Sequence, residues 1–336
     1  MNWEDMQKKL SILGTGYYAP EKILDNFELE KIVDTSDDWI KTRTGIKERR
    51  LAEQGQGCSD LALEASLKAL KNASLNPAQI THILFATFTP DYCTPTSACV
   101  LQDKIGAVNC KMAMDVAAGC TGYIYALETA RGIVHIHPEA KILLLGSEVC
   151  SARLDFEDRN TCVLFGDGAG ATVVAADDNP ELPWVIDTNL RADGNLGHLL
   201  PVGKEGGSAL PYKKGQEVSG DYFIQMKGRE LFRHAVRGMA EMSREIMQEN
   251  NMQITDIDLL IPHQANLRII EALAKKLECP MEKVYVNVES YGNTSAASVV
   301  LALSEAYSQG YIKNGTKVLL AAFGAGLTWG TAIMQF

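Results

Sequence analysis

The feature of the sequence that most constrains its fold is an internal repeat. The segments ITHILFAT (80–87), KMAMDVAAGCTG (111–122) and KILLLG (141–146) correspond in order to DIDLLIPHQ (256–264), KVYVNVESYGNTS (283–295) and KVLLAAFG (317–324). The spacing is also similar, because 35 residues separate Phe85 from Cys120 and 33 separate Leu260 from Asn293. Apolar runs of strand length that alternate with helical segments predict two similar βαβ-rich halves with mostly buried strands.

Apolar periodicity and turn residues mark the remaining elements. Strands are expected over 11–16, 80–87, 112–118, 141–146, 256–262, 284–288, 317–322 and 327–336. Helices are expected to open at 34–40 and to cover 59–72, 96–106, the segment after Cys120, 222–252, 266–277 and 295–309. The stretch 176–220 carries most of the clustered Gly, Pro and Asp. We therefore predict an N-terminal half over 1–180 and a C-terminal half over 181–336.

Two glycine-rich segments resemble phosphate loops only superficially. The segment GTGYYAP (14–20) lacks a third glycine, and Pro20 breaks the helix that a dinucleotide-binding loop requires. In VLFGDGAGATVVA (163–175), β-type residues flank the glycines on both sides. We interpret this second segment as two strands joined by a tight glycine turn.

Composition limits the class of protein. The chain has 336 residues, of which 46% are apolar and 22% charged, which is typical of a folded protein with a sizeable core. No apolar run approaches the roughly 20 residues of a membrane span, and the first residues do not resemble a secretory signal. Eight scattered cysteines without a CxxC motif indicate reduced thiols in the cytoplasm. A formal net charge of −10 argues against general nucleic-acid binding.

Cys120 is a candidate nucleophile. A buried strand is expected before it and a helix after it, so the thiol lies at a helix N-terminus. Unpaired N–H groups and the helix dipole favour a thiolate there and lower its pKa below the usual value of about 8.5. Most buried cysteines are small apolar core residues, so this segment alone leaves both interpretations open.

The repeat adds partners to Cys120. If the two halves pack about a pseudo-twofold axis, Cys120 and Asn293 occupy equivalent strand-to-helix turns that face each other. His263 and the glycine turn 323–326 fall at carboxyl ends of strands, where α/β sheets collect their ligand sites. The other histidines are interpreted as core or surface residues: His82, His135, His137, His198 and His234.

Trp39 and Arg43 are four residues apart and share one face of the first expected helix. An aromatic plane beside a guanidinium suits a flat, phosphorylated ligand. A solvated basic surface with one anchoring tryptophan is the alternative interpretation.

Six segments, in order along nearly the whole chain, resemble one family: VDTSDDWI with TRTGI, DVAAGCTG, FGDGAGA, IPHQANLRI, YGNTSAAS and AFGAGLTWG. The chain resembles the thiolase-type condensing enzymes, in particular β-ketoacyl-acyl carrier protein synthase III. The resemblance implies a thiolase-like α/β fold with two duplicated halves packed as alternating α-β-α-β-α layers. It also implies a cytoplasmic homodimer that starts type II fatty acid synthesis.

The resemblance implies a decarboxylating Claisen condensation of an acyl-CoA primer with malonyl-acyl carrier protein. Cys120 would carry the acyl group, and the backbone amides of Cys120 and Ala325 would form the oxyanion hole. His263 and Asn293 would donate hydrogen bonds to the enolate that forms on decarboxylation. No metal or other cofactor is required, and the sequence shows no metal-ligand spacing.

Further residues match substrate contacts of the family. CoA and pantetheine contacts are implied for Trp39, Arg43, Arg159, Gly228, Phe232 and Asn266. The acyl pocket is expected to involve Phe323 and Thr94. Some relatives carry phenylalanine at the position of Thr94, where it closes the pocket across the dimer interface. We therefore expect a roomier pocket here, which accepts branched or longer primers.

An acidic carrier protein needs a local basic patch on this acidic chain. Arg229, Arg233 and Arg237 recur every four residues along one expected helix. A second basic face follows His263. The residues expected to bind the carrier are Arg233, Arg268, Lys275 and Lys276, with ordinary surface charge as the alternative.

Other functions are weighed against this one. A starter-unit acyltransferase or a polyketide-type condensing enzyme would use the same fold and residues. A nicotinamide-dependent oxidoreductase would depend on GTGYYAP or GDGAGA, which both lack the required context. A non-catalytic scaffold would be expected to have lost the nucleophile or its partners, and all of them are present.

Overall fold

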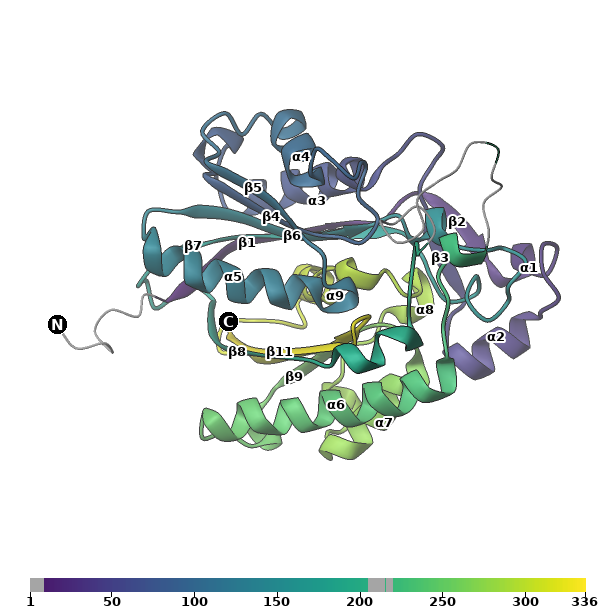
Figure 1. Ribbon diagram of the computed structural model, residues 1–336. Helices are drawn as coiled ribbons and strands as arrows, with labels where there is room; N and C mark the ends of the chain where they lie inside the picture. The colour runs from purple at the N-terminus through teal and green to yellow at the C-terminus, as the bar shows by residue number, and fades with distance from the viewer. Residues whose placement is uncertain (1–8, 205–214, 216–219) are drawn as a thin grey trace.

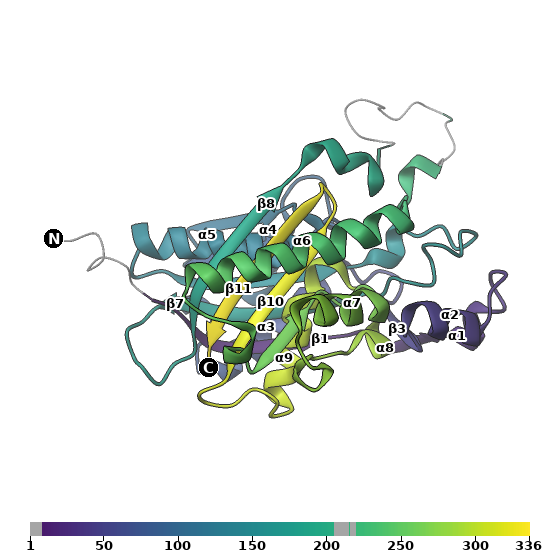
Figure 2. The same cartoon turned by 90° about the horizontal axis from the view of Figure 1, so that it is seen from below.

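The computed structural model describes residues 9–204, 215 and 220–336. Figure 1 shows five layers, in which helices and sheets alternate. The outer helices of the upper layer are α3 (Cys58–Asn72) and α4 (Ser97–Ile105). The central helices are α5 (Gly122–Ile136) and α9 (Ser298–Ser308). The outer helices of the lower layer are α6 (Gly228–Glu249) and α7 (Leu267–Leu277), which cross the second sheet in Figure 2.

Two sheet layers separate these helices. The upper sheet contains β1 (Leu10–Tyr18), β4 (His82–Ala86), β5 (Met112–Val116), β6 (Lys141–Glu148) and β7 (Gly168–Ala176). The lower sheet contains β8 (Trp184–Ala192), β9 (Leu259–Pro262), β10 (Lys317–Gly324) and β11 (Thr328–Gln335). Backbone hydrogen bonds connect all nine strands in the order β5-β4-β6-β7-β1-β8-β11-β10-β9. The two layers join at only two residue pairs of β1 and β8, Leu10 with Val185 and Ser11 with Trp184.

The internal repeat is visible in the pairing of the strands. From β1 outward, β7 and β6 follow antiparallel, and β4 and β5 follow parallel. From β8 outward, β11 and β10 follow antiparallel, and β9 follows parallel. An isolated parallel bridge between Leu260 and Val284 stands where β5 stands in the upper sheet. The two halves therefore share one strand order.

Burial explains why α9 lies in the centre. Every residue from Ser298 to Ala306 is buried, because sheets cover the helix on both sides. A helix that is apolar on all sides is typical of such a position. The outer helices α6 and α7 are amphipathic and expose their basic residues.

Three sequence predictions are wrong in detail. The strand expected over 284–288 is reduced to the bridge at Val284, and the short helix α8 (Val288–Tyr291) follows. The reason is that the side chain of Gln264 accepts hydrogen bonds from the backbone N–H groups of Asn287 and Val288, at 2.9 and 3.2 Å. These N–H groups are therefore not available to a strand ladder. The stretch 176–220, expected to be irregular, contains the whole of β8.

The third error concerns the glycines of GDGAGA. They do not form a turn between two strands, because Gly168 and Gly170 lie inside β7. Phe165 forms only an isolated bridge with Asn293. A Cβ atom at Gly170 would lie 2.6 Å from the backbone nitrogen of Leu301. The glycines therefore allow α9 to pack directly on the backbone of β7.

A small hairpin extends from one end of the layers. Its elements are β2 (Lys22–Asp25), α1 (Asn26–Leu29), α2 (Asp37–Thr44) and β3 (Glu48–Leu51). The fully buried Arg49 ties the hairpin to the main fold, donating to the carbonyl of Leu24 at 3.0 Å and to that of Val163 at 2.7 Å. Among the described helices, none is long and apolar enough to cross a membrane.

Candidate active site

Cys120 lies in a short 3-10 turn, Gly119–Thr121, which leads from β5 into α5. Its Sγ donates to the Oγ of Ser295 at 3.4 Å. Ser295 opens the corresponding turn, Ser295–Ala297, which leads into α9. Gly119 and Ser295 share the left-handed backbone conformation, with φ of 51° and 50°. The two turns of the repeat therefore face each other, and the position equivalent to Cys120 is Ala296.

A cavity of about 460 Å³ opens over the Cys120 turn. Its lining residues come from both halves and are Phe88, Pro90, Ala117, Ala118, Gly119, Cys120, Arg153, Phe165, Leu200, Val202, Gly203, Ile224, Ser295, Ala325 and Gly326. The lining is mostly apolar, which suits an acyl chain. Among the described lining residues Arg153 alone is charged, and its guanidinium lies 4.2 Å from the ring centroid of Tyr222.

The glycine turn after β10 reaches the nucleophile. A Cβ at Gly324 would lie 2.8 Å from the nitrogen of Cys120, and one at Gly119 would lie 3.4 Å from the nitrogen of Ala325. The N–H groups of Cys120 and Ala325 donate to no carbonyl in the turns and loops of the described chain. Two free amides next to one thiol are the geometry that an oxyanion requires.

The pKa of Cys120 differs from the sequence prediction. The pKa of this thiol is raised to about 12, chiefly by burial and in smaller part by the charge of Glu148, although the hydrogen bond with Ser295 lowers it. The prediction of a lowered pKa is therefore wrong for the free protein, since desolvation outweighs the helix start. At neutral pH the free enzyme carries a thiol.

His263 directly follows β9 and is only 2% exposed. Its Nδ1 lies 3.0 Å from the Oγ of Ser298, and that oxygen accepts a hydrogen bond from the N–H of Gln264 at 2.8 Å. The serine hydroxyl can therefore donate to Nδ1, and in the tautomer that makes this bond the imidazole proton is on Nε2. Burial lowers the pKa of His263 to about 4, so the ring is neutral at pH 7.

Asn293 is held in one orientation. Its Oδ1 accepts a hydrogen bond from the N–H of Ser295 at 2.9 Å. The Nδ2 of Asn293 and the Nε2 of His263 have no hydrogen-bond partner among the described residues. Neither atom is among the fully buried unpaired atoms of the described chain, so both retain some accessible surface. Both donors are thus open to a ligand. Neither residue lines the cavity itself. Ser295 connects Asn293 to Cys120, and Ser298 connects His263 to the start of α9.

Sequence reasoning missed Ser295 and Ser298. Both lie within the quoted segment YGNTSAAS, and two serines at a strand-to-helix turn are a signal for side chains that organise the turn. It also missed the cavity walls Phe88 and Pro90, whose sequence gives no such signal.

Four of the six expected CoA contacts converge. The guanidinium of Arg43 lies 4.7 Å, and that of Arg159 lies 5.1 Å, from the ring centroid of Trp39. Asn266 caps α7 by accepting from the N–H of Arg268 at 2.9 Å, and its Nδ2 donates to the carbonyl of Arg43 at 3.1 Å. The other two, Gly228 and Phe232, lie on the first turns of α6.

The two expected acyl-pocket residues lie outside the cavity lining of this single chain. Thr94 is exposed in the loop before α4. Phe323 is buried, with its ring centroid 5.9 Å from that of Trp329. Their roles remain predictions.

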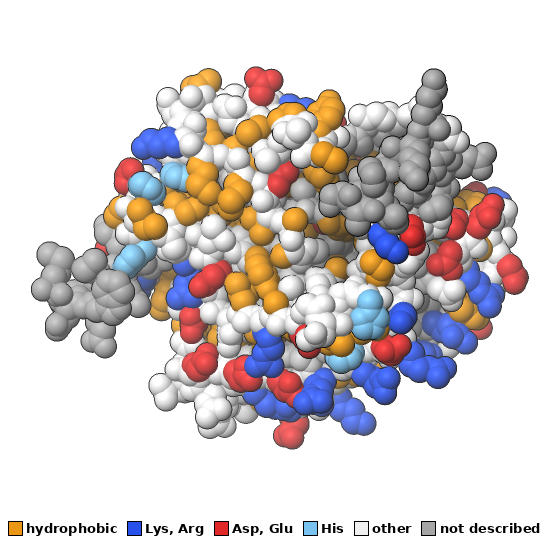
Figure 3. All heavy atoms as spheres, viewed as in Figure 1, with side chains coloured by type: hydrophobic (Ala, Val, Ile, Leu, Met, Phe, Trp, Pro, Cys, Tyr) orange, Lys and Arg blue, Asp and Glu red, His pale blue; other side chains and the backbone are white. Residues whose placement is uncertain are grey.

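Basic side chains gather on the lower helices. Arg233, Arg268, Lys275 and Lys276 are exposed and form no ion pair within the described ranges. Figure 3 shows Lys and Arg side chains concentrated along the lower edge and lower right, where α6, α7 and α2 lie. In the part of the chain that the structure covers, no three His, Cys, Asp or Glu side chains are arranged to hold a metal ion.

The layered fold, with a cysteine turn and its repeat partner at the centre, defines a thiolase-like acyltransferase. A family profile described as 3-oxoacyl-[acyl-carrier-protein (ACP)] synthase III matches residues 114–194, and one described as the C terminal of that enzyme matches residues 247–336. The chain belongs to the β-ketoacyl-[acyl-carrier-protein] synthase III family, and the predicted family and fold are confirmed.

Individual relatives support this assignment. A beta-ketoacyl-[acyl-carrier-protein] synthase III from Oleidesulfovibrio alaskensis is 50% identical over 331 residues, which cover 98% of this chain and 100% of the relative. The crystal structure of 3-oxoacyl-[acyl-carrier-protein] synthase III from Aquifex aeolicus is 44% identical, with a TM-score of 0.89 over 97% of this chain and 100% of that one. The priming beta-ketosynthase of the R1128 polyketide pathway is 32% identical, with the same TM-score of 0.89 over 98% and 97% of the two chains.

Proposed function

We propose that this protein condenses an acyl-CoA primer with malonyl-acyl carrier protein, with loss of CO₂, and so starts type II fatty acid synthesis in the cytoplasm. The proposal is supported by the contacts of two serines at the start of α9. Ser295 is bonded to the thiol of Cys120 and to the amide of Asn293, and Ser298 is bonded to the neutral imidazole of His263. Each half of the repeat contributes part of this set.

In the first half-reaction, Sγ of Cys120 attacks the carbonyl carbon of the acyl thioester. The thiol proton leaves as the new C–S bond forms, and the CoA sulfur is protonated as its bond to the acyl carbon breaks. The negative charge on the carbonyl oxygen is stabilised by the free amides of Cys120 and Ala325. Because the free thiol has a raised pKa, thioester binding and proton removal are expected to be coupled.

In the second half-reaction, the malonyl C–C bond breaks and CO₂ leaves. The electron pair passes to the thioester oxygen as an enolate. Nε2–H of His263 and Nδ2–H of Asn293 donate to this oxygen, and a neutral histidine can do so without first releasing a proton. The enolate carbon then attacks the acyl group on Cys120, and the cysteine leaves as a thiolate that is reprotonated.

The CoA nucleotide would bind at Trp39. In the free protein, Arg159 covers one face of the indole directly, and it is also bonded to the carbonyl of Asp34 at 2.9 Å. An adenine ring between Trp39 and Arg159 therefore requires the arginine to move outward. The exposed residues Arg233 and Arg268 would meet the acidic carrier protein beside this site.

We also propose a homodimer, and the exposed edge of the upper sheet supports it. The strand β5 lies at the edge of the sheet and directly precedes the Cys120 turn. All five of its residues are only half-buried. Tyr92 and Val108 nearby are 59% and 75% exposed, and hydrophobic side chains are frequent in the upper half of Figure 3. An unpaired edge of this kind is typically covered, and a second copy of β5 would cover it and bring Thr94 to the partner's cavity.

A condensation assay tests the proposal. Malonyl-carrier protein is combined with acetyl-, isobutyryl- or octanoyl-CoA, and the β-ketoacyl product is measured for the wild type and for Cys120→Ser. We expect product with the wild type and a loss of at least about 10³-fold in the variant. Full condensing activity in Cys120→Ser would refute the mechanism. A sharp preference for acetyl-CoA would refute the roomier pocket that Thr94 predicts.

A further inference from the structure

Glu148, the last residue of β6, is a buried carboxylate that the reaction above does not use. It accepts hydrogen bonds from the N–H of Phe88 at 3.1 Å, from the N–H and Oγ1 of Thr89 at 3.1 and 2.5 Å, and from Oγ1 of Thr87 at 3.0 Å. Oγ1 of Thr89 in turn accepts from the N–H of Val149 at 2.9 Å. The carboxylate thus ties the chain after β4 to the end of β6.

No arginine, lysine or histidine forms an ion pair with Glu148 within the described ranges. Burial raises the pKa of Glu148 to about 7, which reflects the cost of desolvating its charge. A neutral side chain of similar size would avoid this cost if packing were the only requirement. A carboxylate is suited to this position because it can accept from several converging donors at once.

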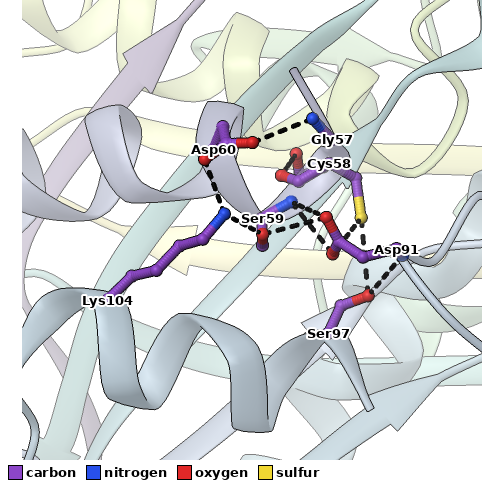
Figure 4. A network of polar contacts seen from close by, with 8 residues as sticks. Gly57, Cys58, Ser59, Asp60, Asp91, Ser97 and Lys104 are labelled. Atoms are coloured by element: carbon purple, nitrogen blue, oxygen red, sulfur yellow. Dashed lines mark hydrogen bonds and ion pairs between the residues drawn. The ribbon is translucent and has the colours of Figure 1, made fainter. Parts of the chain in front are cut away.

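The clamped segment is a wall of the catalytic cavity. Phe88 is bonded to Glu148 through its backbone, and Phe88 and Pro90 both line the cavity over Cys120. The far end of the same loop is fixed separately. Figure 4 shows Asp91 held by Oγ of Ser59 at 2.9 Å and by Sγ of Cys58 at 3.3 Å. The wall is therefore positioned from two sides, and Glu148 holds the backbone of Phe88, whose ring packs on the apolar cluster of Cys150, Leu154, Phe165 and Ile224.

We propose that Glu148 is a positioning residue for primer selection, which sets the space for the acyl group by holding Phe88 and Pro90 against the cavity. This proposal rests on the proposed condensation. In Glu148→Gln the side chain keeps its size, but the NH₂ group that replaces Oε1 faces the N–H of Phe88, which both carboxylate oxygens accept at 3.1 Å. The wall is then released, and larger acyl groups gain room.

The test measures kcat and KM for acylation of Cys120 by acetyl-, isobutyryl- and octanoyl-CoA. We expect the ratio of kcat/KM for octanoyl over acetyl to rise about 10-fold in Glu148→Gln, mainly through KM. Thr89→Val is the second variant, in case Glu148→Gln does not fold. It removes the two hydrogen bonds of Oγ1 of Thr89, to Glu148 and from Val149, and keeps the carboxylate. It should shift the ratio in the same direction.

Asp167→Asn is the matched control. Asp167 is also fully buried, but its partners, the N–H of Ala52 at 2.8 Å and Ser151, lie outside the cavity lining. Its primer ratio should match the wild type. An unchanged ratio in both folded clamp variants, or an equal loss for all primers, would overturn the proposal. Absence of any condensation in the wild type would instead contradict the proposed function. The proposal for Glu148 would then still be tested by the primer ratio measured in the acylation step.

Discussion

Replacing Asn293 by aspartate separates the orientation of this side chain from its chemistry. In the structure, Oδ1 accepts from the N–H of Ser295 at 2.9 Å, while Nδ2 is the atom left open to a ligand. Asn293→Asp keeps an oxygen for Ser295 and has nearly the same size. It replaces only the donor that would face the enolate, so folding should be little affected.

The expected loss follows from the role of that donor. Removing one preorganised donor to a developing oxyanion costs about 10²- to 10³-fold in rate, or roughly 2.7–4 kcal/mol of transition-state stabilisation. The aspartate carboxylate adds a negative charge beside an anionic intermediate, so the loss in decarboxylation should reach the upper end of this range. In the proposed mechanism, acyl transfer to Cys120 depends on the amides of Cys120 and Ala325 instead, so it should stay within a few-fold of the wild type.

The assay follows both half-reactions in one preparation. Release of CO₂ from malonyl-carrier protein reports decarboxylation, and mass spectrometry of the intact protein reports the acyl-Cys120 adduct. Asn293→Ala serves as the comparison, because it loses both the donor and the bond to Ser295. Decarboxylation by Asn293→Asp within 10-fold of the wild type would show that Nδ2 does not stabilise the enolate. An equal loss of both half-reactions would show that Asn293 organises the Cys120 turn instead.

Three further predictions follow from the site. Because burial holds the pKa of His263 near 4, the decarboxylation rate should show no acidic limb from this group between pH 6 and 8. The contribution of the neutral imidazole to folding stability is complete above its unfolded pKa of about 6.5 and is lost progressively as pH falls from there through 4. A rate that halves near pH 6.5, with a titration that disappears in His263→Asn, would contradict this. Because the thiol pKa of Cys120 is about 12, the rate at which iodoacetamide alkylates the free enzyme should be low at pH 7 and should rise steadily to pH 9. A rate that reaches a plateau below pH 8 would indicate a thiolate and contradict this. Trp39→Ala should raise KM for acyl-CoA about 10-fold but leave KM for acyl-pantetheine unchanged, and equal effects on both substrates would place the nucleotide elsewhere.

The sequence was sufficient for the elements whose signal is local or repeated. The apolar runs of β4, β6 and β10 and the helices α3, α4 and α7 lie close to their predicted ranges, because periodicity and caps such as Thr96 and Asn266 act within a few residues. The strand expected over 284–288 failed because its donors bind the side chain of Gln264, which is distant in sequence. The glycines of β7 were misread since their requirement comes from α9, which packs on them from the other half.

The candidate site divides in the same way. Cys120, His263 and Asn293 could be proposed from motifs, because each lies in a quoted segment shortly before a helix, α5, α7 or α9. The pKa of Cys120 could not, since it depends on how completely two distant turns enclose the thiol. Phe88, Pro90 and Glu148 carry no sequence signal, because the cavity wall exists only once β4 and β6 are paired.

The structure also gives a reason why a duplicated fold suits this chemistry. Both halves build the same turn, with a left-handed residue followed by a helix start, at Gly119 and at Ser295. Only one copy needs a nucleophile, so the position equivalent to Cys120 is the small residue Ala296, which lets the two turns approach. In the second turn, Ser295 takes the place of Gly119. Its hydroxyl contacts the thiol of Cys120, and its backbone N–H donates to the side chain of Asn293. Cys120, the proposed acyl carrier, and Asn293, the proposed donor for decarboxylation, are thus both bonded to one residue. Ser295→Gly removes the hydroxyl that contacts the thiol but keeps the N–H that holds Asn293, so it should slow acylation of Cys120 more than decarboxylation.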